Sequence, residues 1–352
     1  MNNQLFLDSI TLLKNLIRTK SYSGEENITA DIIENWFKNN NIKSLRTKNN
    51  VWAKNKLFDN KKPTILLNSH HDTVKPNKSY TKDPFNPEVI DNKLYGLGSN
   101  DAGGALVSLI SVFKNFYNLS NLNYNIIIAA TAEEEIAGEN SLRLLLKELP
   151  EIDFAIIGEP TLMDLAIAEK GLIVFDGKIS GTASHAAHEN KNNAINKLPE
   201  IINWFKNFKF EKISDFLGPV KLTITQINAG SQHNVIPSEI EFVIDVRINE
   251  LYSNKEIVKI LQKRAPCELI PRSTNLKSSS ISSNHKIVKA AIKLGKKTYG
   301  SPTLSDQAAL NCPSLKLGPG DSKRSHIGDE FIYLNEIEKG IDFYIKLLKQ
   351  IL

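Results

Sequence analysis

Short apolar runs that end abruptly in charged residues or histidine mark the first half of the chain. Residues 64–67, 126–130 and 154–157 are such runs, and their length and continuity are typical of strands buried on both faces of a parallel sheet. Apolar residues recur at a helical period between them, in residues 5–18, 30–39, 105–116 and 141–149. Strands that alternate with helices predict an α/β domain.

The pattern changes in the middle of the chain. Strand-like and helix-like segments now follow as strand 173–179, helix 193–208, strands 220–227 and 240–247, and helix 254–262. This order predicts a small sheet with helices on one face, an α+β unit inserted into the first domain. A serine-rich loop at residues 278–283, a helix near residues 287–297 and a terminal amphipathic helix complete the chain.

The length of 352 residues is too great for one hydrophobic core. We therefore expect two domains. The first, residues 1–165 and 276–352, has a mixed central sheet flanked by helices. The second is the inserted α+β domain, residues 166–275.

Composition excludes several classes of protein. The net charge is +5, but lysines are scattered rather than gathered into a stripe, so nucleic-acid binding is not expected. Cys267 and Cys312 are the only cysteines, which excludes a disulfide framework and fits a reducing compartment. The first residues lead into an amphipathic helix rather than a signal peptide, and no apolar run reaches membrane-spanning length. We expect a cytoplasmic protein with no membrane partner.

Three consecutive carboxylates, Glu133, Glu134 and Glu135, directly follow the central apolar run. One interpretation is a helix start, where acidic residues favour the positive end of the helix dipole. The other is a metal site at the carboxyl end of a strand, where open α/β sheets place their ligands. Strict strand alternation would send Glu134 and Glu135 to opposite sides, so the backbone has to leave the extended form there.

Other strand ends carry similar residues. The run at 64–67 leads into His70, His71 and Asp72. On an extended chain His70 and Asp72 share one side, and a carboxylate beside a metal-binding histidine commonly fixes its tautomer. The alternative is a surface histidine pair at a loop; under either interpretation we expect His71 to be a bystander.

Two more acids occupy comparable positions. Asp101 lies on a glycine-rich turn that lacks phosphate-binding spacing and so suits metal ligation better. Glu159 follows the run at 154–157. If these strand ends meet at one edge of the sheet, the negative charge needs cations to offset it. Their number weakens the helix-start interpretation.

Taken together, these motifs resemble the M20 family of dinuclear zinc amidohydrolases and peptidases, which includes acetylornithine deacetylase, succinyl-diaminopimelate desuccinylase, aminoacylases and glutamate carboxypeptidases. The similarity runs from residues 70–74 to residues 318–326. It implies a zinc-peptidase-like catalytic domain and a ferredoxin-like lid through which two subunits form a homodimer.

The resemblance also implies two zinc ions per subunit, for which Co²⁺ can substitute. Asp101 would bridge them, His70 and Glu159 would complete the ligands of one ion, and Glu135 and His326 those of the other. Glu134 would be the general base and Asp72 the partner of His70. The chain departs from the family at Glu133, where aspartate is usual, and at residues 102–104, where a bulkier, lysine-containing run is usual; the second difference bears on substrate contacts.

Residues outside the metal cluster follow from the same resemblance. His185 matches the lid histidine, which reaches the partner subunit's active site and binds the developing oxyanion; without the resemblance it would be a lone surface histidine. Asn234 and Arg247 would hold substrate carboxylates or carbonyls, although Arg247 could instead pair with Asp245. Lys323 and Arg324 could bind a carboxylate or form a solvated charge pair.

The implied activity is hydrolysis of the amide bond of an N-acyl amino acid, with N-acetylornithine in arginine biosynthesis as the first expectation. The alternatives within the enzyme class are succinyl-diaminopimelate desuccinylase and an M20 aminopeptidase or carboxypeptidase. A zinc-bound water with a pKa of about 7 would supply the nucleophile, and Glu134 would take its proton. A metal-binding regulatory protein on the same fold is the non-enzymatic alternative, but it would have no need of Glu134.

Overall fold

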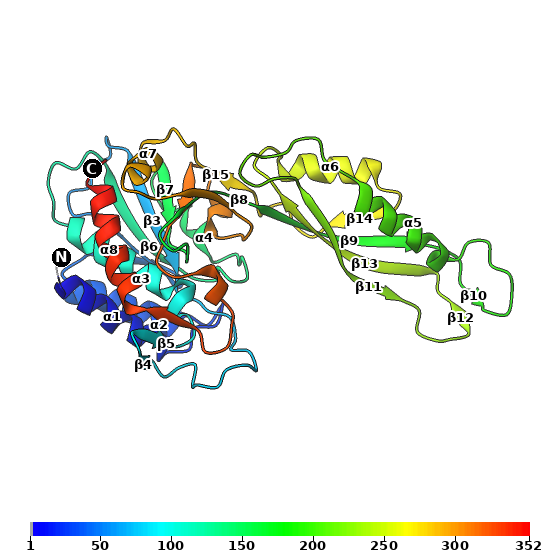
Figure 1. Cartoon of the computed structure of the whole chain (residues 1–352), viewed down its shortest axis with the longest axis horizontal. Coiled ribbons are helices and arrows are strands. Elements are labelled where there is room, and N and C mark those ends of the chain that lie inside the picture. The colour runs from blue at the N-terminus through cyan, green and yellow to red at the C-terminus, as the bar shows by residue number, and fades with distance from the viewer. Residues whose placement is uncertain (1–2) are drawn as a thin grey trace. The chain divides into compact units, whose positions relative to one another are not determined.

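Two units, each with its own hydrophobic core, make up residues 3–352, which the computed structural model describes (Figure 1). Unit 1 extends to Ile167 and also includes Ser280–Tyr299 and Ser305–Leu352. Unit 2 comprises Ala168–Ser279 and a short return, Gly300–Leu304, that the sequence does not predict.

A mixed nine-stranded sheet forms the centre of unit 1, in the order β1-β2-β6-β3-β7-β17-β8-β15, with β16 paired to β8. The inner strands β6, β3, β7 and β17 are parallel, whereas β2 and β8 pair antiparallel to their inner neighbours. The α/β fold with a mixed sheet is therefore as predicted. The strands span Ser44–Thr47 (β1), Asn50–Lys54 (β2), Thr64–His70 (β3), Asn125–Thr131 (β6), Phe154–Ile157 (β7), Leu165–Glu169 (β8), Ser279–Ser280 (β15), Thr298–Ser301 (β16) and Ser314–Lys316 (β17).

The inner strands are apolar without interruption because both of their faces are covered. In β6, Ile126 and Ile128 belong to one hydrophobic cluster and Ile127 to the cluster on the opposite face. Ile65 and Leu66 of β3 divide in the same way. Each such side chain contributes about 1.5–3 kcal/mol when fully removed from water, so the sequence pattern reflects a three-layered unit.

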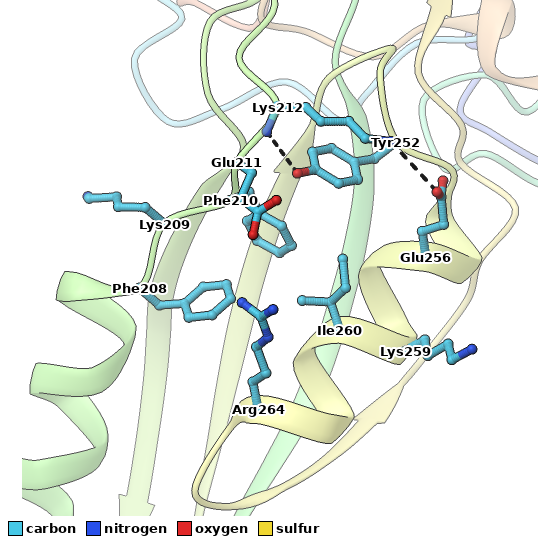
Figure 2. Close-up of a pocket in the computed structure, with 10 residues that line it drawn as sticks. All are labelled: Phe208, Lys209, Phe210, Glu211, Lys212, Tyr252, Glu256, Lys259, Ile260 and Arg264. Carbon is cyan, nitrogen blue, oxygen red and sulfur yellow. Dashed lines mark hydrogen bonds and ion pairs between the residues drawn. The ribbon is translucent and has the colours of Figure 1, made fainter.

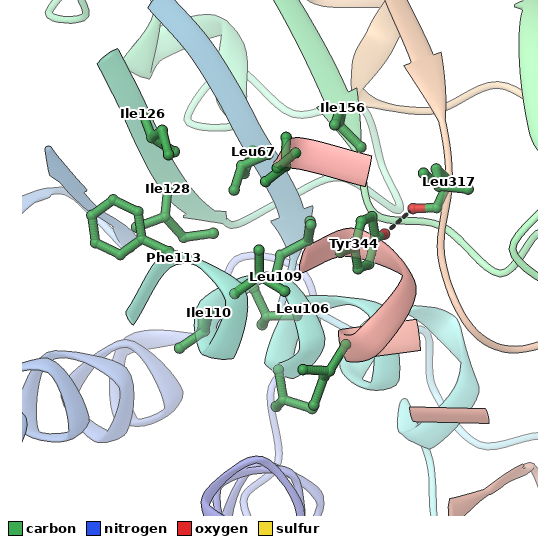
Figure 3. Packing of buried hydrophobic residues seen from close by; sticks show 14 of the residues in the cluster. Leu67, Leu106, Leu109, Ile110, Phe113, Ile126, Ile128, Ile156, Leu317 and Tyr344 are labelled. Carbon is green, nitrogen blue, oxygen red and sulfur yellow. Dashed lines mark hydrogen bonds between the residues drawn. The ribbon is translucent and has the colours of Figure 1, made fainter. Parts of the chain in front are cut away.

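Helices cover the sheet unequally. Five of them contribute to the larger hydrophobic cluster: α1 (Asn3–Ile17), α2 (Asn27–Asn39), α3 (Gly104–Phe116), α7 (Lys286–Lys293) and α8 (Leu334–Leu348). Figure 3 shows Leu106, Leu109 and Phe113 of α3 facing Leu67 and Ile128 of the sheet. In the same view the Tyr344 hydroxyl of α8 donates to the Leu317 carbonyl after β17. The opposite face carries the short helix α4 (Leu142–Leu145).

Smaller elements connect these layers. A three-stranded sheet contains β4 (Val89–Ile90), β5 (Lys93–Tyr95) and β18 (Phe331–Tyr333). Three helical turns occupy Ser99–Gly103 (η1, π-helical), Asp306–Ala309 (η2) and Ser322–Arg324 (η3). The turn η1 contains Asp101, and η3 ends two residues before His326.

Unit 2 follows the order β-α-β-β-α-β of a ferredoxin-like fold. Its elements are β9 (Gly171–Ser180), α5 (Ala194–Asn207), β11 (Lys221–Ala229), β13 (Glu239–Ile248), α6 (Asn254–Arg264) and β14 (Glu268–Pro271). The sheet order is β11-β13-β9-β14, and all three pairings are antiparallel. Alternate residues of β13, beginning with Ile240, are buried with apolar residues of both helices. The helices therefore cover one face of this sheet.

Several predicted boundaries are wrong for local reasons. The helix predicted at residues 30–39 begins earlier, at Asn27, and the Ser23 hydroxyl before it donates to the Asp72 carboxylate. The predicted helix at residues 287–297 stops at Lys293, shortly before Gly295, whose φ of +87° no helix contains. The helix predicted at residues 141–149 is only Leu142–Leu145, and the serine-rich loop contains β15. Within residues 3–352 no helix is both long and apolar enough to span a membrane.

Candidate active site

The predicted metal ligands converge at the carboxyl edge of the parallel strands in unit 1. His70 is the last residue of β3 and lies opposite Thr131, the last residue of β6. Glu159 follows β7 by two residues. Because these strands are parallel, their carboxyl ends share one edge, which is where α/β sheets hold ligands.

Asp101 lies between two groups of potential metal ligands. One group is His70, Asp101 and Glu159, and the other is Asp101, Glu135 and His326; within each group the donor atoms lie within 4.8 Å of one another. The Oδ1 of Asp101 is 3.3 Å from the Nε2 of His70, and its Oδ2 is 3.5 Å from the Nε2 of His326. Each carboxylate oxygen thus faces a different histidine, as a bridging ligand requires.

Contacts of its Nδ1 atom fix the orientation of the His70 ring. Its Nδ1 donates to the backbone carbonyl of Asp72 at 3.0 Å, and the Asp72 carboxylate is slightly farther away, 3.4 Å from the same nitrogen. This bond leaves Nε2 as the atom that faces the carboxylates. The neighbouring His71 is buried on the other side, between the Thr29 hydroxyl and the Asn49 carbonyl.

Two buried carboxylates shape the turn that carries the three glutamates. The backbone N–H groups of Glu134 and Glu135 donate to the two oxygens of Asp72, both at 3.1 Å, and that of Glu133 donates to Glu26 at 3.2 Å. Glu133 has a positive φ of 55°. The backbone therefore leaves the extended form directly after β6, as the sequence argument requires, and there is no helix start at this point.

The three glutamates have different environments. The Glu133 carboxylate accepts from the backbone and side chain of Asn140, which makes it part of the turn. Glu135 accepts from His326 Nε2 at 3.1 Å. The Glu134 carboxylate belongs to neither ligand group and has no hydrogen-bond partner within residues 3–352. A free carboxylate beside the ligands is what a general base needs.

Burial and neighbouring charges shift the pKa values of the acids and histidines in the cluster. Burial and then Asp101 raise the pKa of Glu159 to about 8, and burial also raises the pKa of Glu134, to which Glu159 and Glu135 add. Burial works against protonation of His70, but Asp101 and Asp72 outweigh it and raise its pKa well above the usual value. The hydrogen bond to Glu135 raises the pKa of His326 to about 9.

This donor set fits divalent metal ions. Histidine nitrogens and carboxylate oxygens together are the ligands of catalytic zinc sites. The pKa values of Glu159, His70 and His326 are all raised. Raised pKa values in acids and histidines alike indicate that the cluster favours added positive charge. The two groups that share Asp101 could hold two ions.

Sequence reasoning missed several residues that support the cluster. Glu330 and Asp306 are buried acids close to it. Asp306 accepts from the Asn68 side chain at 2.8 Å and from the Thr131 hydroxyl at 2.7 Å, and so joins the ends of β3 and β6. Asp306 follows no apolar run of strand length, and nothing in the local pattern distinguishes it from a surface acid.

Three of the predicted residues, His185, Asn234 and Arg247, lie on unit 2. His185 is exposed on the short strand β10 (Ser184–His185), which pairs with β12 (Val235–Ile236). Asn234 directly precedes β12, and its carbonyl accepts from Ala186 at 2.9 Å. His185 and Asn234 are therefore close neighbours on one ribbon.

The predicted arginines are engaged by carboxylates of the protein. Arg247 binds Asp245 through two nitrogens, at 2.8 and 3.0 Å, so the alternative interpretation of this residue describes the structure. Arg324 binds both oxygens of Glu336, at 2.8 and 2.9 Å, and is neither a free carboxylate binder nor half of a solvated pair. Lys323 is exposed, and its side chain has no partner in the described residues.

A separate hollow of about 320 Å³ lies on unit 2, near the end of α5 and beside α6. Figure 2 shows Phe208, Phe210, Ile260 and Arg264 pointing toward one another across it. Neither ligand group found within residues 3–352 includes a residue of this hollow. Both ligand groups found in the described residues therefore lie on unit 1.

Comparison with known proteins agrees with this geometry. A model of the peptidase family M20/M25/M40 matches residues 66–350. Succinyl-diaminopimelate desuccinylase of Rickettsia bellii (strain OSU 85-389) is 26% identical, over 97% of this chain and 96% of its own length. The protein of that name from Pelagibacter ubique is 26% identical, over 89% of this chain and 88% of its own length.

Solved structures share the fold. An M20 family metallo-carboxypeptidase from Sulfolobus solfataricus has a TM-score of 0.75 at 17% identity, covering 98% of this chain and 99% of its own. A dinuclear metal-binding M20 peptidase from Bacillus subtilis also has a TM-score of 0.75 at 17% identity, covering 99% of this chain and 98% of its own. The family match extends over most of the chain, so the protein belongs to the peptidase family M20/M25/M40, and the prediction of an amide-hydrolysing enzyme of this family is confirmed.

Proposed function

We propose that this chain is a two-metal deacylase that hydrolyses the amide bond of an N-acyl amino acid. The observation that carries the proposal is the placement of Asp101 between two ligand groups, with the unpartnered carboxylate of Glu134 beside them. N-succinyl-diaminopimelate is the first candidate substrate, because the relatives similar over nearly the whole chain carry that activity in their names. N-acetylornithine, the expectation from the sequence, is now second.

Zinc is the proposed metal. His70, Asp101 and Glu159 would hold one ion, and Asp101, Glu135 and His326 the other. When bound, zinc would polarise the amide carbonyl and lower the pKa of a water molecule to about 7. Mixed histidine and carboxylate ligation supports zinc over calcium or magnesium, which prefer oxygen ligands alone.

Glu134 is proposed to move the proton. Its carboxylate takes a proton from the attacking water and returns it to the amine nitrogen as the amide bond breaks. The hydrogen bond from the Glu134 N–H to Asp72 supports this role, because it fixes the turn from which the side chain projects. Lys323, exposed three residues before His326, is the remaining candidate on unit 1 for binding a substrate carboxylate.

The experiment that tests this function is an assay of amine release from a matched panel. The panel contains N-succinyl-diaminopimelate and N-acetylornithine. It also contains the same two amino acids with the acyl groups exchanged, N-acetyl-diaminopimelate and N-succinylornithine, and a tripeptide. We expect the highest kcat/KM for an N-succinyl substrate, loss of activity after exhaustive chelation, and recovery with Zn²⁺ or Co²⁺. Undiminished hydrolysis by verified metal-free protein would contradict the proposal, and a preference for the N-acetyl substrates would reverse the order of the candidates.

Glutamine substitutions separate the base from the ligand. Glu134→Gln keeps both ligand groups, so we expect full metal content with kcat lower by about 10²–10⁴-fold. Glu135→Gln removes a member of one group, and we expect it to retain less metal as well. Metal analysis and steady-state kinetics on both variants check this. The control is Glu133→Gln, which makes the same substitution at a neighbouring residue of the turn that belongs to neither ligand group. Equal metal content and equal activity in the Glu134 and Glu135 variants would show that the roles are assigned wrongly.

We also propose that unit 2 forms a homodimer and that His185 acts at the active site of the second copy. Strand β11 supports this, because it is an edge strand, exposed along most of its length, and its free edge pairs with no strand in the described part of the chain. His185 is exposed on a ribbon and could donate a hydrogen bond to a developing oxyanion. Dimerisation and the cytoplasmic location stay predictions.

Mixed dimers test the role of His185. His185→Ala should bind both metals and lose about 10²–10³-fold in kcat, the usual effect of removing one oxyanion donor. Mixing it with Glu134→Gln should recover part of the activity, because each mixed dimer regains one complete site. His188→Ala is the control, since its ring lies beside that of His185 in the turn that follows β10. Mixed dimers that are verified by native mass spectrometry but stay inactive would exclude action across subunits.

A further inference from the structure

The turn that carries Asp101 is attached to the segment that carries His326 by one buried carboxylate, that of Glu330. We infer that Glu330 is a positioning residue that holds Asp101 and His326 in register, so that the ligand group formed by Asp101, Glu135 and His326 depends on it. The inference rests on the proposed two-metal function. It assigns a role to a residue that the mechanism above does not use.

The carboxylate of Glu330 accepts from the backbone of η1 and of Gly98, the residue directly before it. Its Oε1 accepts from the N–H groups of Asn100 at 2.8 Å and Asp101 at 2.9 Å, and its Oε2 accepts from the N–H of Gly98 at 3.0 Å. Glu330 is only 1% exposed. Three donors from one turn therefore converge on one side chain that water hardly reaches.

The turn needs an acceptor from elsewhere in the chain because its first N–H groups have none within the turn. Gly98 has a φ of +75°, and Asp101 has a φ of −116° and a ψ of 98°, values outside the helical range. The N–H groups of Gly98, Asn100 and Asp101 lie at the start of η1, where a helix offers no internal acceptor, so they are free to point at Glu330. Buried N–H groups left without an acceptor destabilise a fold, so the carboxylate favours the conformation of the turn in which all three N–H groups reach it.

The second attachment is through the chain. Glu330 follows His326 by four residues, and the Glu330 carbonyl accepts from Gly96 at 3.0 Å. Directly after it, β18 pairs with β5, with Phe331 opposite Tyr95. Contacts of Glu330 thus fix the segment that ends at Asp101 against the segment that begins at His326. His70 is instead the last residue of β3, and Glu159 follows β7 by two residues, so strands of the central sheet place both of them.

The neighbouring residue provides a matched control. Asp329 accepts from the backbone of Thr81 and Lys82, both at 2.8 Å, and from the Thr81 hydroxyl. It anchors a loop to the same segment with the same kind of bond, but that loop carries none of the predicted ligands. Asp329→Asn therefore reports what the loss of a loop anchor does by itself.

The experiment measures metal binding rather than turnover. Metal-free wild type, Glu330→Gln, Glu330→Asp and Asp329→Asn are titrated with Co²⁺ alone, followed by calorimetry and by visible absorption, and circular dichroism checks that each variant is folded. We expect wild type and Asp329→Asn each to bind two ions. The affinity of Asp329→Asn for each ion should equal that of wild type. Glu330→Gln should keep one ion within a few-fold of the wild-type affinity and bind the second about 10–100-fold more weakly, the range found for residues that orient metal ligands.

Glu330→Asp keeps the charge but withdraws the carboxylate by one carbon. It should show the same loss to a smaller degree, and it carries the test if the glutamine variant does not fold. Second-site affinities equal to wild type in the folded Glu330 variants, or a loss no larger than that of Asp329→Asn, would overturn the inference. A wild-type protein that binds fewer than two ions would instead overturn the proposed function on which the inference rests.

Discussion

Repulsion among carboxylates gathered at one edge of the central sheet is the constraint on which unit 1 depends. Asp101, Glu135 and Glu159 share this edge with the unpartnered Glu134. Burial and mutual repulsion raise the pKa of Glu159 to about 8. Such an arrangement weakens a fold unless cations offset the charge, and the family to which the chain belongs includes a structure described as dinuclear metal-binding.

A second set of acids keeps the first set in place. Asp72, Glu26 and Glu330 are buried, and each accepts backbone N–H groups from a turn that carries or adjoins a predicted ligand. For Glu330, burial and Asp101 raise the pKa to about 8, although its backbone hydrogen bonds favour the charged form. The acids of the site thus divide by their partners: those that accept backbone N–H groups shape the turns, and those without such bonds face the cluster.

The sequence predicted the parts of this structure that follow from local patterns. Continuous apolar runs predicted β3, β6 and β7, because only strands covered on both faces lack polar positions, and the residues at their ends predicted where the ligands meet. Glu330 could not be predicted in this way, because its partners lie about 230 residues earlier in the chain and are backbone groups without a side-chain pattern. The pairing of Arg324 was not predicted either, because its partner Glu336 lies 12 residues later, on α8. A helix that ends at Lys293 rather than at residue 297 reflects the positive φ of Gly295, which a period of apolar residues does not reveal.

The central claim is that Asp101 bridges two metal ions. Anomalous diffraction from crystals grown with Zn²⁺, recorded on both sides of the zinc absorption edge, tests it most directly. The account predicts two zinc peaks per chain, each about 2.0–2.2 Å from one oxygen of Asp101. The first peak should also contact His70 and Glu159, and the second Glu135 and His326. A single peak, or two peaks without a shared Asp101, would contradict it.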